Sequence, residues 1–300
     1  MAAILAILPI FTLIVLGYVL GWRQWLTPAS AGGLSWATFK LFLPCLLLTG
    51  IARAPLGDAL SPLLLLVYFI PALLLFAVFS VVMHRHTGQT SAVGLAASYS
   101  NNVLIGIPLM TALFGHEGLV YLFALLAVHS LILFSTQSLY AALGQGAGQR
   151  LDILNLLKTL ANPIVVGLLL GLVINLSGLG LPKPLWQVLD WLARAGLPCA
   201  LIVVGVGLTR YRLRTSPTIW AICIGKLAVF PVLVLALGSV MPGLSPLALQ
   251  VLVLAAAGPI GVNVLAFARP GEEQHTVGAS IFLSTLLAAA TLPLWMLLMG

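Results

Sequence analysis

Charge is what this sequence lacks most. Only 6% of its 300 residues are charged and 61% are hydrophobic, whereas soluble domains carry about 25% charged residues. This composition excludes a soluble globular protein. The net charge of +7 does not indicate a nucleic-acid surface, because the basic residues are scattered over short loops, where they set membrane orientation. We therefore expect an all-α integral membrane protein in contact with lipid and not with nucleic acid.

Acidic residues are absent from the interiors of the apolar stretches. Proton pumps and cation antiporters usually use buried carboxylates, so a cation exchanger is disfavoured and an anion or a neutral polar solute is favoured. The acidic residues lie in loops or at the ends of apolar stretches: Asp58, Glu117, Asp152, Asp190, Glu272 and Glu273.

Cysteine is also scarce, and no catalytic pattern is present. Cys45, Cys199 and Cys223 lie in apolar segments without metal-ligand spacing, so we interpret them as packing residues. There is no Ser/His/Asp set, no His/Cys metal site and no phosphate-binding Gly-Lys loop. We predict that the protein is not an enzyme and has no cofactor, and we leave the coupling ion open between H⁺ and Na⁺.

Long apolar runs are abundant. Stretches of about 20 apolar residues predict membrane-spanning helices. The first stretch is apolar from residue 2 and lacks the basic region and the cleavage site of a signal peptide, so we interpret it as the first span. We predict ten spans, at 3–21, 34–52, 62–83, 91–113, 118–141, 155–175, 185–207, 217–239, 246–268 and 276–299.

The basic loop residues predict the orientation. With the N-terminus outside, eight basic residues fall in cytoplasmic loops and three in external loops, which follows the positive-inside rule. We therefore expect a multi-pass protein of the bacterial inner membrane with both termini outside. The cytoplasmic set is Arg23, Arg85, Arg150, Lys158, Arg210, Arg212, Arg214 and Arg269, and the external set is Arg53, Lys183 and Arg194.

The two halves of the chain are related. Pro9-Ile10 and Pro163-Ile164 are 154 residues apart, and Leu43-Pro-Cys45 matches Leu197-Pro-Cys199 at the same offset. Five spans per copy place the second copy upside down in the membrane, which is an inverted repeat. We predict a first five-helix repeat at 1–141, a short cytoplasmic linker at 142–154 and a second, inverted five-helix repeat at 155–300.

The fourth and ninth spans are interrupted. Gly106 and Pro108 interrupt the fourth, and Pro259 and Gly261 interrupt the ninth. Paired interruptions in two repeats indicate a transporter whose substrate binds near the bilayer midplane, where the broken helices cross. We predict that these four residues form the hinges and the crossover.

Three carboxamides lie beside these interruptions. Asn101, Asn102 and Asn263 are candidate substrate-binding residues, since amides in a lipid-facing helix lack partners. The alternative is that they hydrogen-bond neighbouring helices.

Three further polar residues lie inside spans. His129 and Ser130 begin a polar stripe in the fifth span and are further candidate substrate-binding residues, since a polar stripe at this depth could line the cavity. His129 is the natural titrating group if protons are coupled, although a packing role is equally compatible. Lys226 lies deep in the eighth span. It could neutralise an anionic substrate or bind carbonyls freed by a broken helix, and the sequence does not separate these roles.

Specific motifs connect the chain with a known family. The run Asn101-x-x-x-x-Gly106-Ile-Pro-Leu109 resembles the fourth span of auxin efflux carriers, and Ala257-Gly-Pro-Ile-Gly261 resembles their ninth. The resemblance implies ten helices in two inverted repeats, broken fourth and ninth helices that cross, and a substrate contact from Asn101. Because the linker is short, the chain is similar to the bacterial branch, which includes malonate and other small-carboxylate transporters.

We therefore predict a secondary transporter of a small organic anion that works by an elevator or rocking motion. Spans 1, 2, 6 and 7 would form the scaffold and a homodimer surface. One alternative is a sodium-coupled symporter of a bile-acid-like or neutral solute, since broken-helix carbonyls hold Na⁺ without a carboxylate. A channel or a membrane receptor is the alternative from another class.

Overall fold

The computed structural model describes residues 2–54, 61–144, 163–178, 180–209 and 215–299, and its elements are helices. The one β-type contact among these residues is an isolated bridge between Ser100 and Ile260. The first half contains α1 (Ala2–Trp22), α2 (Pro28–Ala37), η1 (Thr38–Phe42), α3 (Leu43–Ala52), α4 (Pro62–Thr87), α5 (Val93–Ser98), η2 (Asn102–Gly106) and α6 (Ile107–Gly144). The second contains α8 (Pro163–Ser177), α9 (Lys183–Leu208), α10 (Pro217–Ile224), η3 (Gly225–Val229), α11 (Phe230–Val240), α12 (Pro246–Ala257), η4 (Val262–Phe267) and α13 (Glu272–Leu298).

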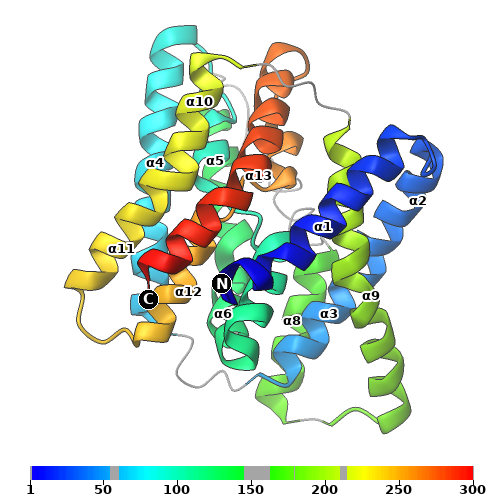
Figure 1. Cartoon of the computed structure of the whole chain (residues 1–300). Coiled ribbons are helices and arrows are strands. Elements are labelled where there is room, and N and C mark those ends of the chain that lie inside the picture. The colour runs from blue at the N-terminus through cyan, green and yellow to red at the C-terminus, as the bar shows by residue number, and fades with distance from the viewer. Residues whose placement is uncertain (1, 55–60, 145–162, 179, 210–214, 300) are drawn as a thin grey trace.

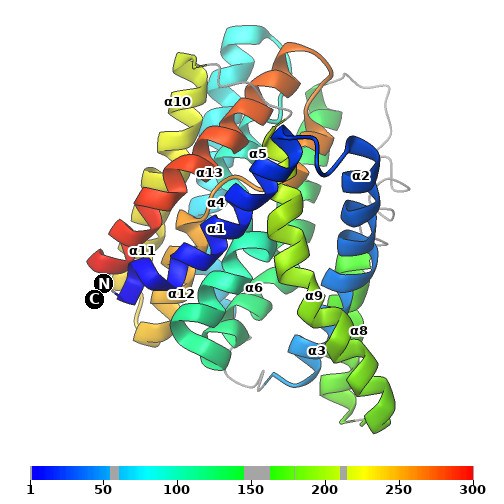
Figure 2. The same ribbon diagram turned by 45° about the vertical axis from the view of Figure 1, so that its right-hand side comes forward.

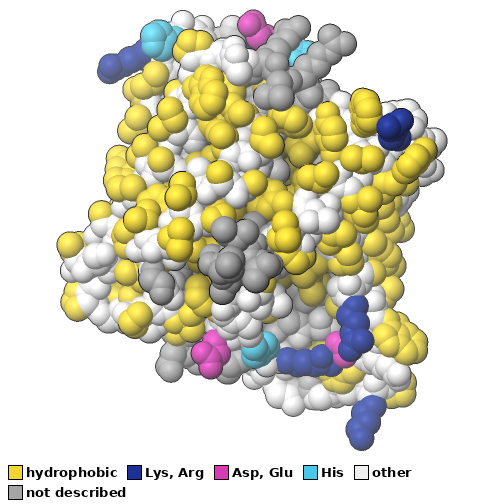
Figure 3. All heavy atoms as spheres, in the orientation of Figure 1, with side chains coloured by type: hydrophobic (Ala, Val, Ile, Leu, Met, Phe, Trp, Pro, Cys, Tyr) yellow, Lys and Arg dark blue, Asp and Glu magenta, His cyan; other side chains and the backbone are white. Residues whose placement is uncertain are grey.

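The helices are those of a multi-pass membrane protein, as the composition predicts. In the part of the chain that the structure describes, six continuous helical stretches are long and apolar enough to cross a bilayer, and three shorter apolar helices accompany them. Figure 3 shows hydrophobic side chains over a broad band, with most charged side chains gathered toward its two ends. The count of ten spans and the inverted repeat stay predictions. Most of the linker predicted at 142–154 lies outside the described residues.

Two groups of helices pack side by side (Figure 1). In the first group, α1 packs along α9, and α3 packs along α8 and α9. In the second group, α4 packs with α5 and α11, and α12 packs with α11 and α13. The helix α6 touches both groups, and the two chain ends lie close together in both ribbon views (Figures 1 and 2).

Glycine allows the helices of the first group to approach closely. A Cβ on Gly17 of α1 would collide with the backbone of Ile202 in α9, and one on Gly171 of α8 would collide with the backbone of Leu48 in α3. In lipid, where helix association relies on van der Waals contact, small residues of this kind are favoured at helix interfaces.

Three prolines follow directly after a widened turn of helix. Pro44, Pro108 and Pro231 each stand two residues after the end of a π-helical segment, at the second position of the following α-helix. A proline ring clashes with the carbonyl four residues earlier and leaves it without a donor. An extra residue in the preceding turn accommodates the ring. The carbonyl of Leu227, four residues before Pro231, instead accepts a hydrogen bond of 2.9 Å from Trp295 Nε1.

The predicted junction between the fourth and fifth spans is a kink within α6. Gly115 has φ 59° and ψ −139°, a conformation open to glycine and strained for other residues. Helix therefore continues on both sides of a sharp change of direction, where the sequence predicts a short loop.

Candidate functional site

The two interrupted segments meet in the centre of the molecule. The backbone N–H of Asn101 donates to the carbonyl of Pro259 over 2.8 Å, and the N–H of Gly261 donates to the carbonyl of Tyr99 over 3.1 Å. The two extended segments thus satisfy some of each other's backbone groups, which a membrane helix would otherwise satisfy internally. We call this pairing of residues 99–101 with 259–261 the crossing.

The four predicted hinge residues divide into two pairs. Pro259 and Gly261 lie in the extended segment between α12 and η4. In the other half the extended backbone is at 99–101, so Gly106 and Pro108 lie within the helix that follows it. Pro108 does not end the helix, because the widened turn before it accommodates the proline ring. The helix is interrupted earlier, at 99–101, where polar side chains can bond the backbone.

Asn101 begins the helix after the crossing. Its Oδ1 accepts a hydrogen bond of 3.4 Å from the N–H of Leu104, which makes it the N-cap of η2. Its Nδ2 donates to no side chain or backbone oxygen in the described part of the chain. Asn101 is 6% exposed, so this amide presents spare donors in a buried place.

Asn102 belongs to a network centred on the Tyr68 hydroxyl. Asn102 Nδ2 donates to Tyr68 Oη over 3.2 Å, and this hydroxyl donates to Ser100 Oγ over 3.2 Å and lies 3.3 Å from His129 Nε2. All four residues are buried. Asn102 Oδ1 has no hydrogen-bond partner among the described residues, and this is unusual because buried polar atoms are nearly always paired. The network therefore leaves one acceptor unfilled.

Tyr99 connects the other predicted residues. Its hydroxyl lies 2.9 Å from Ser130 Oγ, and Tyr99 lines one small cavity together with Asn263. Its ring packs on that of His129, with the ring centres 4.6 Å apart. The structure thus brings together all five residues that the sequence singles out for substrate binding: Asn101, Asn102, Asn263, His129 and Ser130.

Two neighbouring cavities adjoin the crossing. A small one of about 10 Å³ has room for no more than one water molecule; Asn101, Asn102, Asn263 and His129 are among its lining residues. The larger of these two cavities, of about 290 Å³, lies beside it and is lined by residues of α2, the end of α9 and residues of η1, η2, η4 and α13. Phe39, Leu104 and Val262 line both cavities and so form the apolar partition between them.

Lys226 lies behind the crossing and not in either cavity. Its side chain is fully buried, and Nζ donates to the carbonyl of Ala256 near the end of α12. It also lies 4.9 Å from the centre of the Phe230 ring. Of the two roles that the sequence leaves open, the structure shows the contact with a carbonyl at a broken helix.

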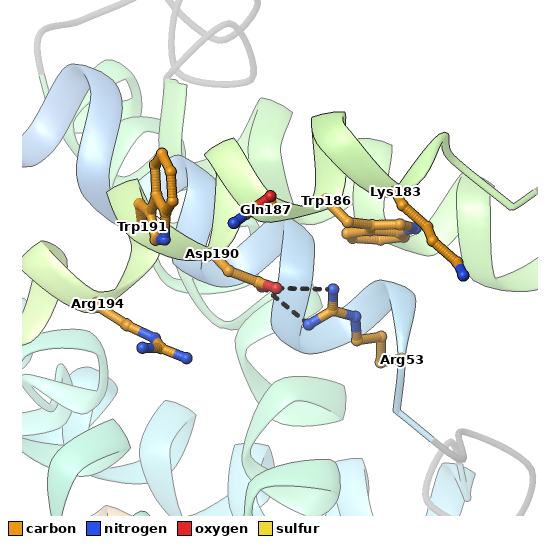
Figure 4. Close-up of a pocket in the computed structure, with 7 residues that line it drawn as sticks. All are labelled: Arg53, Lys183, Trp186, Gln187, Asp190, Trp191 and Arg194. Carbon is orange, nitrogen blue, oxygen red and sulfur yellow. Dashed lines mark hydrogen bonds and ion pairs between the residues drawn. The ribbon is translucent and has the colours of Figure 1, made fainter.

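A basic pocket lies at the opposite end of α9 from the larger cavity. It has a volume of about 370 Å³. Arg53 forms a two-pronged ion pair with Asp190, at 2.8 and 3.0 Å, and lies over the ring of Trp186 (Figure 4). Arg194 and Lys183 also line this pocket without a described ion pair of their own. Three cations and one carboxylate give it a positive balance.

Sequence reasoning missed Tyr68, Tyr99 and Ser100. The two tyrosines hold the amides in place, yet a tyrosine in an apolar helix resembles an ordinary core or interface residue. Ser100 offered a weak signal, since it adjoins Asn101 in the polar run Ser98-Tyr-Ser-Asn-Asn102.

Broken helices that cross among buried amides are typical of membrane transport proteins. The chain belongs to the family described as Membrane transport protein, whose model matches residues 2–296. It is 27% identical over 295 residues to a Rhizobium meliloti protein named "Putative malonate transporter", covering 95% of this chain and 92% of that protein. It is 26% identical over 296 residues to an "Uncharacterized transporter" of Methanothermobacter thermautotrophicus, covering 96% of each. The resemblance to auxin efflux carriers is thereby confirmed, and the protein is a membrane transporter.

Proposed function

We propose that the protein is a secondary active transporter of a small organic anion, of the size and charge of malonate, with its substrate site at the crossing. The observation that supports this most is the geometry of the crossing. Two broken helices pair through their backbones, and three asparagines surround a small cavity beside that pairing. A cavity wide enough for a small solute adjoins it.

The polar groups at the crossing suit an anion. Asn101 offers spare amide hydrogens, and the N–H of Val103, in the first turn of η2, donates to no carbonyl of the described chain. Both lie at the start of a helix, where free N–H groups and the helix dipole favour negative charge. No carboxylate of the described residues lines either cavity. A carboxylate substrate also agrees with the name of the Rhizobium meliloti relative.

Alternating access fits the packing of the helices. The group of α1, α2, α3, α8 and α9 would form the scaffold, and the group that contains the crossing would move against it. Contacts across the scaffold support the predicted inverted repeat. Gly17 meets Ile202 and Gly171 meets Leu48, and both members of the first pair lie 154 positions from members of the second.

The remaining features of the proposal concern the membrane. We place the protein in the cytoplasmic membrane with both termini outside, so the larger cavity opens toward the cytoplasm and the basic pocket toward the exterior. A homodimer would form through the scaffold, whose outward face carries exposed apolar side chains such as Val15, Leu170 and Val173.

Transport of labelled malonate into proteoliposomes tests the proposal. We expect saturable uptake and counterflow by the wild type, competition by other small dicarboxylates, and at least tenfold slower uptake by Asn101→Ala. The control is Ser239→Ala, because Ser239 is exposed on α11 and bonds only its own helix. Flux that does not saturate and shows no counterflow would indicate a channel, and equal uptake by Asn101→Ala would refute the site.

A further inference from the structure

Lys226 places its amino group in the interior of a membrane protein, with no carboxylate beside it among the described residues. It is 0% exposed, and the ion pairs found among the described residues are Arg53–Asp190 and Arg269–Glu273, both remote from it in the chain. A buried charge is costly unless something compensates it. Any charge on Lys226 must therefore be compensated by the groups packed around its amino group.

The end of α12 supplies that compensation. The last carbonyls of a helix have no partner within the helix and carry its partial negative charge. Gly258, the residue after α12, is extended, and no backbone N–H of the described chain caps this end. Ala255, Ala256 and Ala257 are all fully buried, so water cannot cap it either. Lys226 Nζ donates to the Ala256 carbonyl over 2.5 Å and fills this vacancy.

Aromatic rings connect this amino group with the amide network. Nζ faces the ring of Phe230, and Phe230 packs edge-on against Tyr68, with ring centres 5.2 Å apart. Tyr68 in turn bonds Asn102 and adjoins His129, the other buried titratable nitrogen in this region. The amino group of Lys226 thus lies one layer of side chains behind the candidate substrate site.

In transporters with broken helices, free carbonyls at a half-helix end commonly hold a coupling Na⁺. We propose that the ammonium group of Lys226 is a tethered substitute for that ion: it neutralises the end of α12 at all times, so the crossing assembles and accepts an anion without sodium. The inference deepens the proposed function, on which its transport arm rests. It assigns Lys226 as a positioning residue that acts through α12 and does not touch the substrate.

The first test measures thermal stability and needs no substrate. The purified wild type is heated in NaCl, KCl or choline chloride at one ionic strength, and we expect the same melting temperature in all three. Lys226→Ala opens a small cation site at the end of α12. We expect its melting temperature to be lower in choline and to be raised by Na⁺ or methylammonium in a saturable manner.

The second test measures malonate uptake in the same salts. We expect wild-type uptake to be unchanged when choline replaces Na⁺, and Lys226→Ala to lose at least tenfold in choline and to regain activity with Na⁺ or methylammonium. Lys226→Gln is the decisive control, because its amide can still donate to the Ala256 carbonyl but has no charge. We expect Lys226→Gln to be as impaired as Lys226→Ala in choline.

Two results would overturn the inference. One is a wild type whose stability or uptake requires Na⁺, which would place a sodium site at the crossing in addition to Lys226. The other is a Lys226→Gln protein with wild-type stability and uptake in choline, which would reduce Lys226 to a neutral hydrogen-bond donor. If Lys226→Ala does not fold, the inference is still tested by the salt dependence of the wild type and by the behaviour of Lys226→Gln in choline. If the wild type moves no carboxylate, the proposed function fails, while the melting temperatures still test the role of the cation.

Discussion

At the scale of single residues, Gly261 is where space is tightest in the crossing. A Cβ placed on Gly261 would lie 2.5 Å from two ring atoms of Tyr99, whereas one on Gly258 would come no closer than 3.3 Å to any atom. Both glycines have φ values open to alanine, −71° and −59°, so backbone strain does not enter the comparison. The two positions form a matched pair.

We expect Gly261→Ala to displace the Tyr99 ring, which would break its contact with Ser130 and slow malonate uptake by at least tenfold. Overpacking of this kind costs about 1–3 kcal/mol, so the melting temperature should also fall. Gly258→Ala should change both quantities much less. Equal effects of the two substitutions on uptake, measured at equal protein in the vesicles, would contradict this role of Tyr99.

The Tyr68 hydroxyl allows a second prediction at this scale. Tyr68→Phe keeps the ring contacts and removes the group that Asn102, Ser100 and His129 share. Hydrogen bonds between membrane helices contribute about 0.6 kcal/mol each on average, so we expect a small loss of thermal stability but a clear loss of uptake. Wild-type kinetics in Tyr68→Phe would show that the network does not position Asn102.

Residues of the candidate site differed in how well the sequence revealed them. Asparagines in an apolar span are conspicuous because they need partners in lipid, and the structure brings all three together around one cavity. The tyrosines that hold them were missed because their rings suit a core and only their hydroxyl positions reveal a second role. The sequence could not decide between the two roles considered for Lys226, because its partner is a backbone carbonyl, which no sequence pattern indicates.

At the scale of helices, α1 and α9 are held at close range by Gly205. A Cβ there would collide with the backbone of Ile14 and Tyr18, while one on Gly207, a half-turn further along α9, would meet nothing within 4 Å. We expect Gly205→Ala to lower the melting temperature in detergent through the separation of the two helices. Gly207→Ala should be neutral or stabilising, since alanine is favoured over glycine in a helix by about 1 kcal/mol.

Comparable melting temperatures for these two variants would contradict the close packing of α1 on α9. The presence of long apolar helices was predictable from runs of apolar residues, but this pairing was not, since it joins segments far apart in the chain. That prolines would disturb the helices was predictable from the sequence. Where the helix is interrupted was not, because a widened turn accommodates Pro108 and the extended backbone lies instead at 99–101.

At the scale of the whole molecule, the two cavities at opposite ends of α9 predict opposite accessibility. We expect Ser35→Cys, in the larger cavity, to react with an impermeant maleimide from the cytoplasmic side, and Gln187→Cys, in the basic pocket, from the outside. Cys45, Cys199 and Cys223 would first be replaced by alanine. The opposite labelling pattern would reverse the proposed orientation.

The class of the molecule was predictable because so few charges and so many apolar runs are compatible only with a membrane. Its division into two packed groups is seen in the structure, and the count of ten spans and the repeat itself stay predictions. The structure adds that the two broken segments bind each other's backbone. This contact depends on three-dimensional placement, and sequence similarity between the halves indicates it only indirectly.

The central claim is that the crossing binds a small carboxylate, and equilibrium binding of malonate to the purified protein tests it most directly. Titration calorimetry would compare the wild type with Asn101→Ala and with Ser239→Ala, after each is shown to be folded. We predict saturable binding by the wild type and by Ser239→Ala, and at least tenfold weaker binding by Asn101→Ala. Equally tight binding by Asn101→Ala would place the substrate elsewhere and contradict the account.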